Sequence, residues 1–450
     1  MQRSKNYFVD LFAGCGGLSL GLEDAGFLPA YVSEIDPDAM ESYLINRDAE
    51  FPLLREKYNS YDIQENLTAK KNALDGLSSS FEVDYGIKKG DLGLVVGGPP
   101  CQGYSAMGQR RTFKDLVRKD IPSNYLYKDM IKVISSLQPK AFIFENVGGL
   151  MTGKWTGDGE KGEIWHDVRK AFTNIENYSA HFELVKAKDY GVPQRRPRII
   201  MVGLRDDFSF ENDDGLVANG LLPEQTNDFP NLSELLDDII DEQYEHKAKF
   251  RRSIGDDDKD GKEKYKKQVS LKTTEYPSDA STEIQKTLRT RKDGTVAKKG
   301  DSLTEHEYSY HSAKLLETFQ YMIDHNVSRK SEKTEGQGLP KHMLTKKWSQ
   351  KLLPRVWKNG GPDITATSLP DDFVHYAQPR SLTVREWARL QMFPDWYEFS
   401  GKRTTGGKRR AGDPSKGDWK RETPKYTQIG NAVPVKLASE IGNHIRKLIL

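Results

Sequence analysis

The sequence predicts an α/β fold in which a buried parallel sheet is covered by helices and the chain carries a large insert. Short runs rich in Val, Ile and Phe alternate with amphipathic stretches as far as about residue 205. A glycine-rich turn follows the first of these runs, and the alternation is lost over residues 206–372. Strands that alternate with helices are typical of a parallel sheet covered on both faces.

The predicted strands are short, continuous apolar runs, as expected for strands that are buried on both faces. They cover residues 7–12, 30–35, 92–98, 140–147 and 198–204. Helical periodicity predicts helices over residues 18–27, 127–138, 381–393 and 436–450. We therefore expect one domain over residues 1–204, completed by 424–450, and a less regular domain over 205–423.

The composition fits a protein of a reducing cytosol. The chain is 36% hydrophobic and 30% charged, and no apolar run approaches the ~20 residues of a membrane span. Its start lacks the small-residue cleavage site of a signal peptide. Cys15 and Cys101 are the only cysteines, which leaves no disulfide framework or Cys-rich zinc site. We expect a cytoplasmic protein without a membrane segment or a metal.

Positive charge is concentrated near the C-terminus, although the net charge is only +2. Between Lys402 and Lys425, nine Lys and Arg residues accompany three acidic ones. Such a segment is either a solvated surface or a surface for phosphate contacts. Lys408, Arg409 and Arg410 are the candidates for such contacts.

The first strand leads into a glycine turn, Phe12-Ala13-Gly14-Cys15-Gly16-Gly17. Glycines at a strand-to-helix turn let the backbone approach a ligand closely. Glu34 at the end of the second strand could accept both hydroxyls of a ribose, and Asp62 with Ile63, at the expected end of a third strand, could reach an adenine. These residues alone also fit a dinucleotide site, although Ser19 occupies the third glycine position of that fingerprint.

Cys101 lies in a second glycine-bounded loop, Gly97-Gly98-Pro99-Pro100-Cys101, just after a predicted strand. Open α/β sheets place their chemistry at this end of the strands. A reactive thiol needs surroundings that favour the thiolate, and Gln109, Arg110 and Arg111 could supply positive potential and phosphate contacts. Cys101 is therefore a candidate nucleophile, with an inert buried cysteine as the alternative.

Glu145 ends an otherwise apolar predicted strand. A carboxyl group is rarely buried without a partner, and a raised pKa would make it a proton donor near neutral pH. Arg196 and Arg198 head the last predicted strand and should share a side-chain direction. Two adjacent guanidinium groups suit a carbonyl-bearing ligand or a carboxylate.

Taken in order, these motifs resemble the C5-cytosine DNA methyltransferase family. The resemblance covers residues 7–204 and about 360–450, including the Pro-Pro-Cys and Glu-Asn-Val motifs and the terminal Gly-Asn-Ala-Val-Pro. It implies a Rossmann-like, S-adenosylmethionine-dependent methyltransferase sheet with an inserted target-recognition domain. In that family the target cytosine is flipped out of the duplex, because its C5 and C6 cannot be attacked inside the stack.

The resemblance assigns roles to the catalytic candidates. Cys101 would attack C6 of the cytosine, and Glu145 would bind and protonate N3. Arg196 would hold Glu145 or the cytosine carbonyl, and Arg198 would support the base and the loop. The methyl group would pass from S-adenosylmethionine to C5, leaving S-adenosylhomocysteine.

The resemblance also implies binding residues. Those for the cofactor are Phe12, Gly14, Gly17, Glu34, Ile35, Asp62, Ile63, Gly98, Pro100, Leu126, Asn431 and Val433. Ile35 stands where an aromatic residue is common in the family. Those for DNA are Gln102, Ser105, Gln109, Arg110, Arg111, Lys408, Arg409 and Arg410. The implied partner is double-stranded DNA, bound by a monomer, with a restriction endonuclease or defence-system proteins acting in parallel in a bacterial cytoplasm.

Three other functions share some of these features. A tRNA cytosine methyltransferase would carry a Cys-Phe-Thr motif, and this chain has no cysteine after Cys101. A non-catalytic regulator would usually lack the Pro-Cys or Glu-Asn-Val residues, and both motifs are intact. A nicotinamide dehydrogenase fits the glycine turn but not the cysteine loop.

Overall fold

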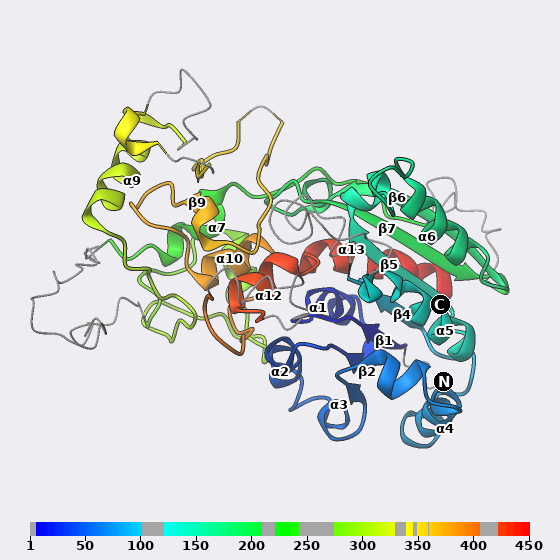
Figure 1. The fold of residues 1–450 in the computed structure, drawn as a ribbon. Coiled ribbons are helices and arrows are strands. Elements are labelled where there is room, and N and C mark those ends of the chain that lie inside the picture. The colour runs from blue at the N-terminus through cyan, green and yellow to red at the C-terminus, as the bar shows by residue number, and fades with distance from the viewer. Residues whose placement is uncertain are drawn as a thin grey trace, which may run out of the picture. The chain divides into compact units, whose positions relative to one another are not determined.

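The computed structural model describes residues 6–100, 121–208, 221–242, 274–328, 339–344, 349–358, 360–405 and 422–450. The chain divides into two compact units (Figure 1). The first unit comprises Met1–Phe229, Asp363–Thr365 and Glu398–Leu450, and the second comprises Pro230–Pro362 and Ala366–Tyr397. Each unit is described by itself below.

A seven-stranded sheet forms the centre of the first unit, in the order β3-β2-β1-β4-β5-β7-β6. The strands are β1 (Tyr7–Leu11), β2 (Leu28–Ser33), β3 (Asn59–Ser60), β4 (Leu94–Gly97), β5 (Ala141–Val147), β6 (Tyr178–Lys186) and β7 (Pro197–Arg205). Strands β3, β2, β1, β4 and β5 pair in parallel. Strand β7 is antiparallel to both β5 and β6.

The sheet is therefore mixed, whereas the sequence indicated a parallel one. The predicted strands are present, the third of them as the two-residue β3, and β6 is additional. Strand β6 alternates between exposed and partly buried positions, so it lacks the apolar run of a strand covered on both faces. Only residues 187–196 connect β6 to β7, and a parallel pair needs a longer crossover.

Helices cover the sheet, and their bounds are α1 (Gly17–Asp24), α2 (Pro37–Ile45), α3 (Pro52–Glu56), α4 (Ala73–Tyr85), α5 (Tyr127–Leu137), α6 (Glu163–Thr173), α12 (Lys425–Asn431) and α13 (Val435–Ile449). The C-terminal helix α13 packs against α1, so the two ends of the chain meet in this unit (Figure 1). The α1, α5 and α13 helices confirm three of the helices predicted from periodicity. Their termini differ from the predicted ones by at most three residues.

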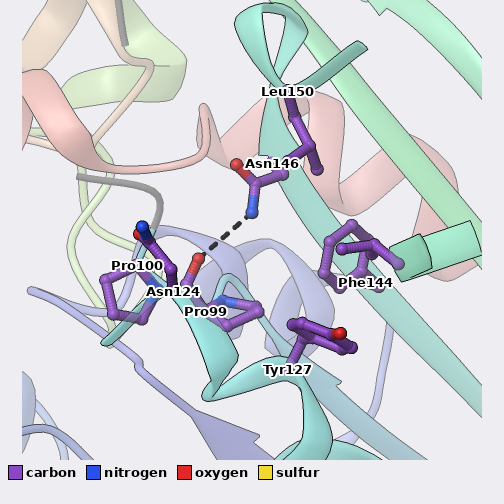
Figure 2. A pocket seen from close by; sticks show the side chains of 8 residues that line it. Pro99, Pro100, Asn124, Tyr127, Phe144, Asn146 and Leu150 are labelled. Carbon is purple, nitrogen blue, oxygen red and sulfur yellow. Dashed lines mark hydrogen bonds between the residues drawn. The ribbon is translucent and has the colours of Figure 1, made fainter. Parts of the chain in front are cut away.

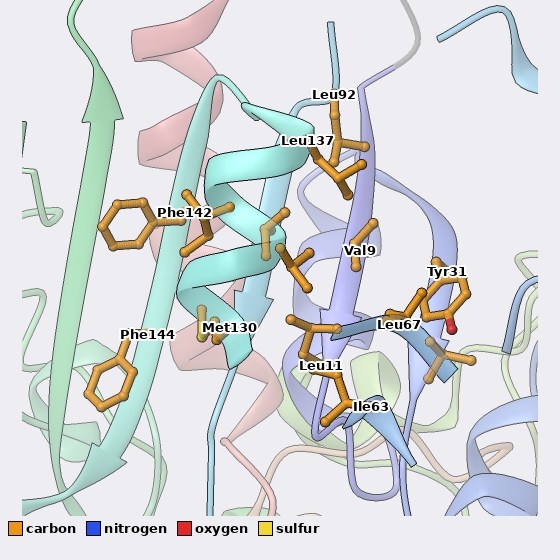
Figure 3. Packing of buried hydrophobic residues seen from close by; sticks show 14 of the residues in the cluster. Val9, Leu11, Tyr31, Ile63, Leu67, Leu92, Met130, Leu137, Phe142 and Phe144 are labelled. Carbon is orange, nitrogen blue, oxygen red and sulfur yellow. The ribbon is translucent and has the colours of Figure 1, made fainter. Parts of the chain in front are cut away.

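The hydrophobic core of the first unit lies between the sheet and α5 (Figure 3). Met130 of α5 is fully buried, as are Val9 and Leu11 of β1 and Phe142 of β5. These strands carry buried side chains at almost every position, because helices cover both faces. This packing holds the strands, and therefore the loops that follow them, in fixed positions.

The second unit has little regular structure. It contains α7 (Leu232–Leu236), α8 (Glu283–Arg289), α9 (Ala313–His325), α10 (Val384–Leu390), β8 (Lys351–Leu352) and β9 (Phe373–Val374). The α10 helix confirms the helix predicted over residues 381–393, and a capping box of Thr383 and Glu386 sets its start. Its interior combines buried apolar residues, such as Leu235, Trp387 and Phe393, with buried ion pairs: Asp238 binds both Arg289 and Arg389 at 2.6 Å.

In the described part of the chain, no helix is long and apolar enough to cross a membrane. The sequence likewise lacks an apolar run of that length.

The contact between α1 and α13 generates a stability prediction. A Cβ atom on Gly21 would lie 2.5 Å from Ala438 Cβ and 2.7 Å from the Ser439 nitrogen, both on α13. Gly21→Ala should therefore lower the free energy of unfolding by about 2 kcal/mol or more through overpacking. Gly76→Ala in α4 is the matched control, because no described atom lies within 4 Å of its added Cβ. The control should raise stability by about 0.5–1 kcal/mol. Urea denaturation would measure both, and equal effects would contradict the close packing.

Candidate active site

The sheet brings the predicted ligand-binding residues to one edge. Strands β1 to β4 are parallel neighbours, so the segments that follow them emerge on the same side. The glycine turn follows β1, Glu34 follows β2, Asp62 lies two residues after β3, and Gly98 follows β4. This is the edge at which open α/β sheets bind ligands.

The glycine turn has the backbone that its sequence requires. Gly14 and Gly16 have φ of 56° and 86°, in the left-handed region that favours glycine. Phe12 also has a positive φ of 61°. Gly17 is the first residue of α1. Cys15 is fully buried in the turn, and burial raises the pKa of its thiol to about 12. Cys15 is thus a protonated packing residue.

Glu34 is arranged to receive two further hydrogen bonds. Its Oε2 accepts the Gly14 N–H and its Oε1 accepts the Asp36 N–H, both at 2.8 Å. Burial raises the pKa of Glu34, and these N–H groups oppose the rise. A carboxylate oxygen has two lone-pair directions, so each oxygen keeps one for a ribose hydroxyl. The chemistry of this residue fits a nucleoside.

Asp62 is fixed in a similar way. Its Oδ1 accepts the N–H groups of Gln64 and Glu65, which begin a π-helix over Gln64–Thr68. Its Oδ2 accepts no hydrogen bond from the described residues and can take the amino group of an adenine. Ile63 is buried, and the side chain of Ile35 is 71% exposed.

A small pocket lies at the end of β4, directly before the cysteine loop (Figure 2). Its lining combines apolar side chains with two asparagines: Pro99, Pro100, Asn124, Tyr127, Phe144, Asn146, Leu150 and Val168. Asn146 Nδ2 donates to the Pro99 carbonyl at 3.1 Å. This bond ties the end of β5 to the residues that precede Cys101. Asn146 belongs to the Glu-Asn-Val motif, but the sequence predicted no role for it or for Asn124, although a polar residue in an apolar strand was a usable signal for Asn146.

Glu145 lies beside this pocket, on β5. A Cβ atom on Gly98 would come within 2.8 Å of Glu145 Oε2, so the carboxyl group lies against the start of the cysteine loop. The Arg198 Nε is 2.8 Å from Glu145 Oε1. Burial raises the pKa of Glu145, and the guanidinium groups of Arg198 and Arg196 oppose that rise.

The two arginines differ from their expected arrangement. Arg196 precedes β7, has φ of 26°, and donates to the Ala432 carbonyl at 2.7 Å. Arg198 forms the ion pair with Glu145, which was one of the two contacts expected of Arg196; the other was the cytosine carbonyl. The shared strand direction fails because the strand begins only at Pro197. The Arg196 contact places residues 431–433 next to the start of β7.

The remaining cofactor candidates lie in the same unit. Leu126 immediately precedes α5, two residues from Asn124 of the pocket, and Pro100 lines that pocket. Asn431 ends α12 and is exposed, whereas Val433 is buried. The other candidates lie outside the described residues: Cys101, Gln102, Ser105, Gln109, Arg110, Arg111, Lys408, Arg409 and Arg410. Among the residues described, no group of His, Cys, Asp and Glu could hold a metal ion.

A buried polar network connects the strand and the helix on either side of the glycine turn. Ser19 Oγ donates to Asp10 Oδ2 at 2.5 Å and lies 2.9 Å from the Tyr43 hydroxyl. The Arg47 guanidinium covers the Tyr43 ring at 3.9 Å and pairs with Glu23 at 2.6 Å. Ser19 stands where the dinucleotide-binding fingerprint has its third glycine, and its hydroxyl group binds Asp10 near the end of β1.

The sequence is similar to a known protein family over almost its whole length. Residues 7–447 match the family described as C-5 cytosine-specific DNA methylase. The chain is 27% identical to the type II methyltransferase M.DdeI of Desulfomicrobium norvegicum, over 97% of this chain and 88% of that protein. It is 28% identical to the type II methyltransferase M.XorII of Xanthomonas oryzae pv. oryzae, over 98% and 84% of the two chains.

One solved structure supports the fold. It is a putative DNA modification methyltransferase encoded within an E. coli prophage, with a TM-score of 0.62 and 21% identity over 99% of both chains. The likeness confirms the predicted methyltransferase α/β fold.

The network behind the glycine turn generates a pH prediction. Burial raises the pKa of Asp10 to about 7, although its Ser19 hydrogen bond and Arg47 lower it. Between about pH 4 and 7 the folded state therefore holds a proton that the unfolded state releases. Stability should fall as pH rises through this window, by at most about 1.4 kcal/mol per pH unit from this group.

The asparagine side chain of the Asp10→Asn variant cannot titrate, so the variant should lose the contribution of Asp10 to the pH dependence of stability. Urea denaturation at several pH values would give the difference in stability between the two proteins. A difference that does not change with pH would contradict the raised pKa.

Proposed function

The chain belongs to the C-5 cytosine-specific DNA methylase family, and from this premise we propose that it methylates a flipped cytosine within a specific duplex sequence, using Cys101 and Glu145. DNA (cytosine-5-)-methyltransferase activity follows from the family itself. The residue roles, the site specificity and the biological setting are the proposal. One observation carries it: the buried Glu145 carboxyl group lies against Gly98, three residues before Cys101.

Family membership implies S-adenosylmethionine as the cofactor, and the residues at the sheet edge fit it. Bound there, it supplies an electrophilic methyl group on a sulfonium. Glu34 would accept the ribose hydroxyls and Asp62 the adenine amino group. The other proposed contacts surround these two carboxylates: Phe12, Gly14, Gly17, Ile35, Ile63, Gly98, Pro100, Leu126, Asn431 and Val433.

The proposed chemistry is nucleophilic catalysis by this chain's own side chains. The Cys101 thiolate adds to C6 of the cytosine, which makes C5 nucleophilic enough to be methylated. Glu145 donates its proton to N3 and so stabilises the negative charge that the addition creates. Loss of the C5 proton then releases Cys101. The raised pKa of Glu145 supports its role as the proton donor.

Arg196 and Arg198 are proposed to position other residues of the site rather than to react themselves. Arg198 orients the Glu145 carboxyl group and limits the rise of its pKa. Arg196 braces the residues around Ala432, which include the cofactor candidates Asn431 and Val433. The family resemblance suggested a different division of roles, in which Arg196 contacted Glu145 or the cytosine carbonyl and Arg198 supported the base and the loop.

The proposed substrate is double-stranded DNA. Gln102, Ser105, Gln109, Arg110 and Arg111 would contact it from the cysteine loop, and Lys408, Arg409 and Arg410 from the basic segment. The second unit would serve as the target-recognition domain. Like M.DdeI and M.XorII, both named type II methyltransferases, the protein would act in restriction-modification, in parallel with an endonuclease. A monomer in the bacterial cytoplasm fits this role.

The nucleophile can be tested by substitution and by trapping. Cys101→Ser should abolish methyl incorporation into DNA, because a hydroxyl is far less nucleophilic than a thiolate, while binding of S-adenosylhomocysteine is retained. DNA containing 5-fluorocytosine should form a covalent adduct with the wild-type protein, because fluorine blocks loss of the C5 substituent.

Bisulfite sequencing of host DNA that has been exposed to the wild-type protein would identify the methylated sequence. Appreciable methylation by the Cys101→Ser variant would exclude the covalent mechanism. Incorporation into tRNA but not into DNA would exclude the proposed substrate.

Glu145→Gln tests the proton donor. The amide cannot transfer a proton to N3, so single-turnover methylation should slow by about 10²–10⁴-fold. DNA affinity should change far less, because the interaction develops in the transition state. Glu183→Gln is the matched control, since this exposed glutamate lies on β6 of the same sheet. A rate near that of the control would reduce Glu145 to a structural role.

A further inference from the structure

Residues 290–300 of the second unit form an ordered hairpin, although the sequence indicated only a loop. Thr290 and Val296 form an antiparallel bridge. The Ala297 N–H donates to the Arg289 carbonyl at 3.1 Å, and the Arg291 N–H donates to the Thr295 carbonyl at 2.7 Å. These bonds define a short ladder that closes on the three residues 292–294.

The turn of this hairpin has a well-defined geometry. The Gly294 N–H donates to the Arg291 carbonyl at 2.9 Å, and Gly294 has φ of 81°. A type I turn followed by a left-handed glycine is a common three-residue hairpin connection. Asp293 Oδ1 accepts from the N–H of Thr295 at 2.9 Å and from its hydroxyl at 2.7 Å. The tip is thus held by local bonds.

The base of the hairpin is anchored in the interior of its unit. Arg289 is buried and pairs with Asp238 at 2.6 Å. The same guanidinium donates to the Ser278 carbonyl at 2.9 Å and lies 4.0 Å from the Tyr276 ring. The Asp395 N–H donates to the Leu288 carbonyl at 2.7 Å, one residue before the ladder. The backbone of the hairpin is therefore held in one conformation.

Those side chains are exposed and positively charged. Between Thr290 and Gly300 there are four basic residues and a single acidic residue, Asp293. Arg291 pairs with Asp301 at 2.7 Å, and the Lys292 ammonium lies 4.8 Å from the Trp396 ring. Lys298 and Lys299 are exposed. The Lys298 N–H and the Lys298 charge both help to lower the pKa of Asp301, and the Lys299 N–H donates to Asp279 Oδ1 at 2.8 Å, but among the described residues no carboxylate lies within ion-pair distance of either ammonium group. Two adjacent ammonium groups on a rigid support favour a polyanionic ligand.

We propose that this hairpin, residues 290–300, is a DNA-contacting surface whose Lys298 and Lys299 bind backbone phosphates of the duplex. The proposal rests on the proposed function, since it takes the substrate DNA as the polyanion. Phosphate contacts position a protein on a duplex without reading its sequence, so these lysines supply affinity and orientation. The ordered ladder lowers the entropic cost of placing the two charges.

The chain supplies a closely matched control for this surface. Residues 297–300 read Ala-Lys-Lys-Gly, and residues 87–90 read Ile-Lys-Lys-Gly. In both turns the N–H of the following aspartate donates to the carbonyl of the first lysine, at 3.0 Å for Asp301 and 2.9 Å for Asp91. Lys88 and Lys89 are also exposed, but they precede β4 at the end of the sheet away from the candidate site.

The experiment compares Lys298→Ala/Lys299→Ala with Lys88→Ala/Lys89→Ala in the full-length protein. Fluorescence anisotropy would measure binding of a labelled random-sequence duplex over a range of salt concentrations. The hairpin variant should bind more weakly, and its slope of log affinity against log salt should fall by about 0.9 for each phosphate that the protein no longer neutralises. The control should match the wild type. Lys298→Arg/Lys299→Arg should restore both affinity and slope.

The outcomes separate this proposal from the function on which it rests. A far-UV circular dichroism spectrum and a urea denaturation midpoint equal to those of the wild type would show that the hairpin variant is folded. Equal affinities and slopes for the two alanine variants would overturn the hairpin proposal while leaving DNA methylation intact. A wild-type protein that neither binds nor methylates duplex DNA would instead overturn the proposed function.

Discussion

The candidate active site depends on the reversed direction of β7. Five parallel strands carry the glycine turn, Glu34, Asp62 and Glu145 to their carboxyl edge, and a sixth parallel strand would start at the opposite edge. Because β7 is antiparallel to β5, its first residues arrive where β5 ends, and Arg198 pairs with Val147 in the ladder. Residues two apart in a strand share a face, so Arg198 lies diagonally next to Glu145. One change of strand direction therefore creates the buried ion pair.

A different constraint holds the second unit together. Its helices are few, and its buried apolar residues, such as Leu235, Trp387 and Phe393, lie beside buried ion pairs. Asp238 is shared by Arg289 and Arg389, and Arg389 also pairs with Asp395 at 2.5 Å. Removal of one partner from such a network leaves an uncompensated buried charge, which costs more than the loss of a surface pair. The network therefore fixes loops that have no regular structure of their own, the hairpin included.

Sequence patterns located the main strands and the residues at the sheet edge, because apolar runs and glycine turns are local signals. The direction of a strand cannot be predicted from its own residues, because the apolar run 198–204 would look the same in a parallel or an antiparallel strand. The short connection at 187–196 determines that β7 is antiparallel to β6. The family resemblance gave Arg196 a contact with Glu145 or with the cytosine carbonyl, whereas the ion pair of Glu145 is with Arg198. The segment 290–300 is charged and shows no strand pattern, whereas its order comes from the hydrogen bonds of its ladder and from the buried Arg289 at its base.

The surroundings of Glu145 resolve two opposite demands on a proton donor. A carboxyl group in water is ionised at neutral pH and has no proton to give, whereas one buried without partners would hold its proton too firmly and would be costly to bury. Burial beside Gly98 raises the pKa of Glu145, and the Arg198 and Arg196 guanidinium groups oppose the rise. The same guanidinium groups stabilise the carboxylate that remains after N3 has taken the proton. An arginine suits this position better than a lysine, because it keeps its charge when buried and its planar group fixes the carboxyl orientation.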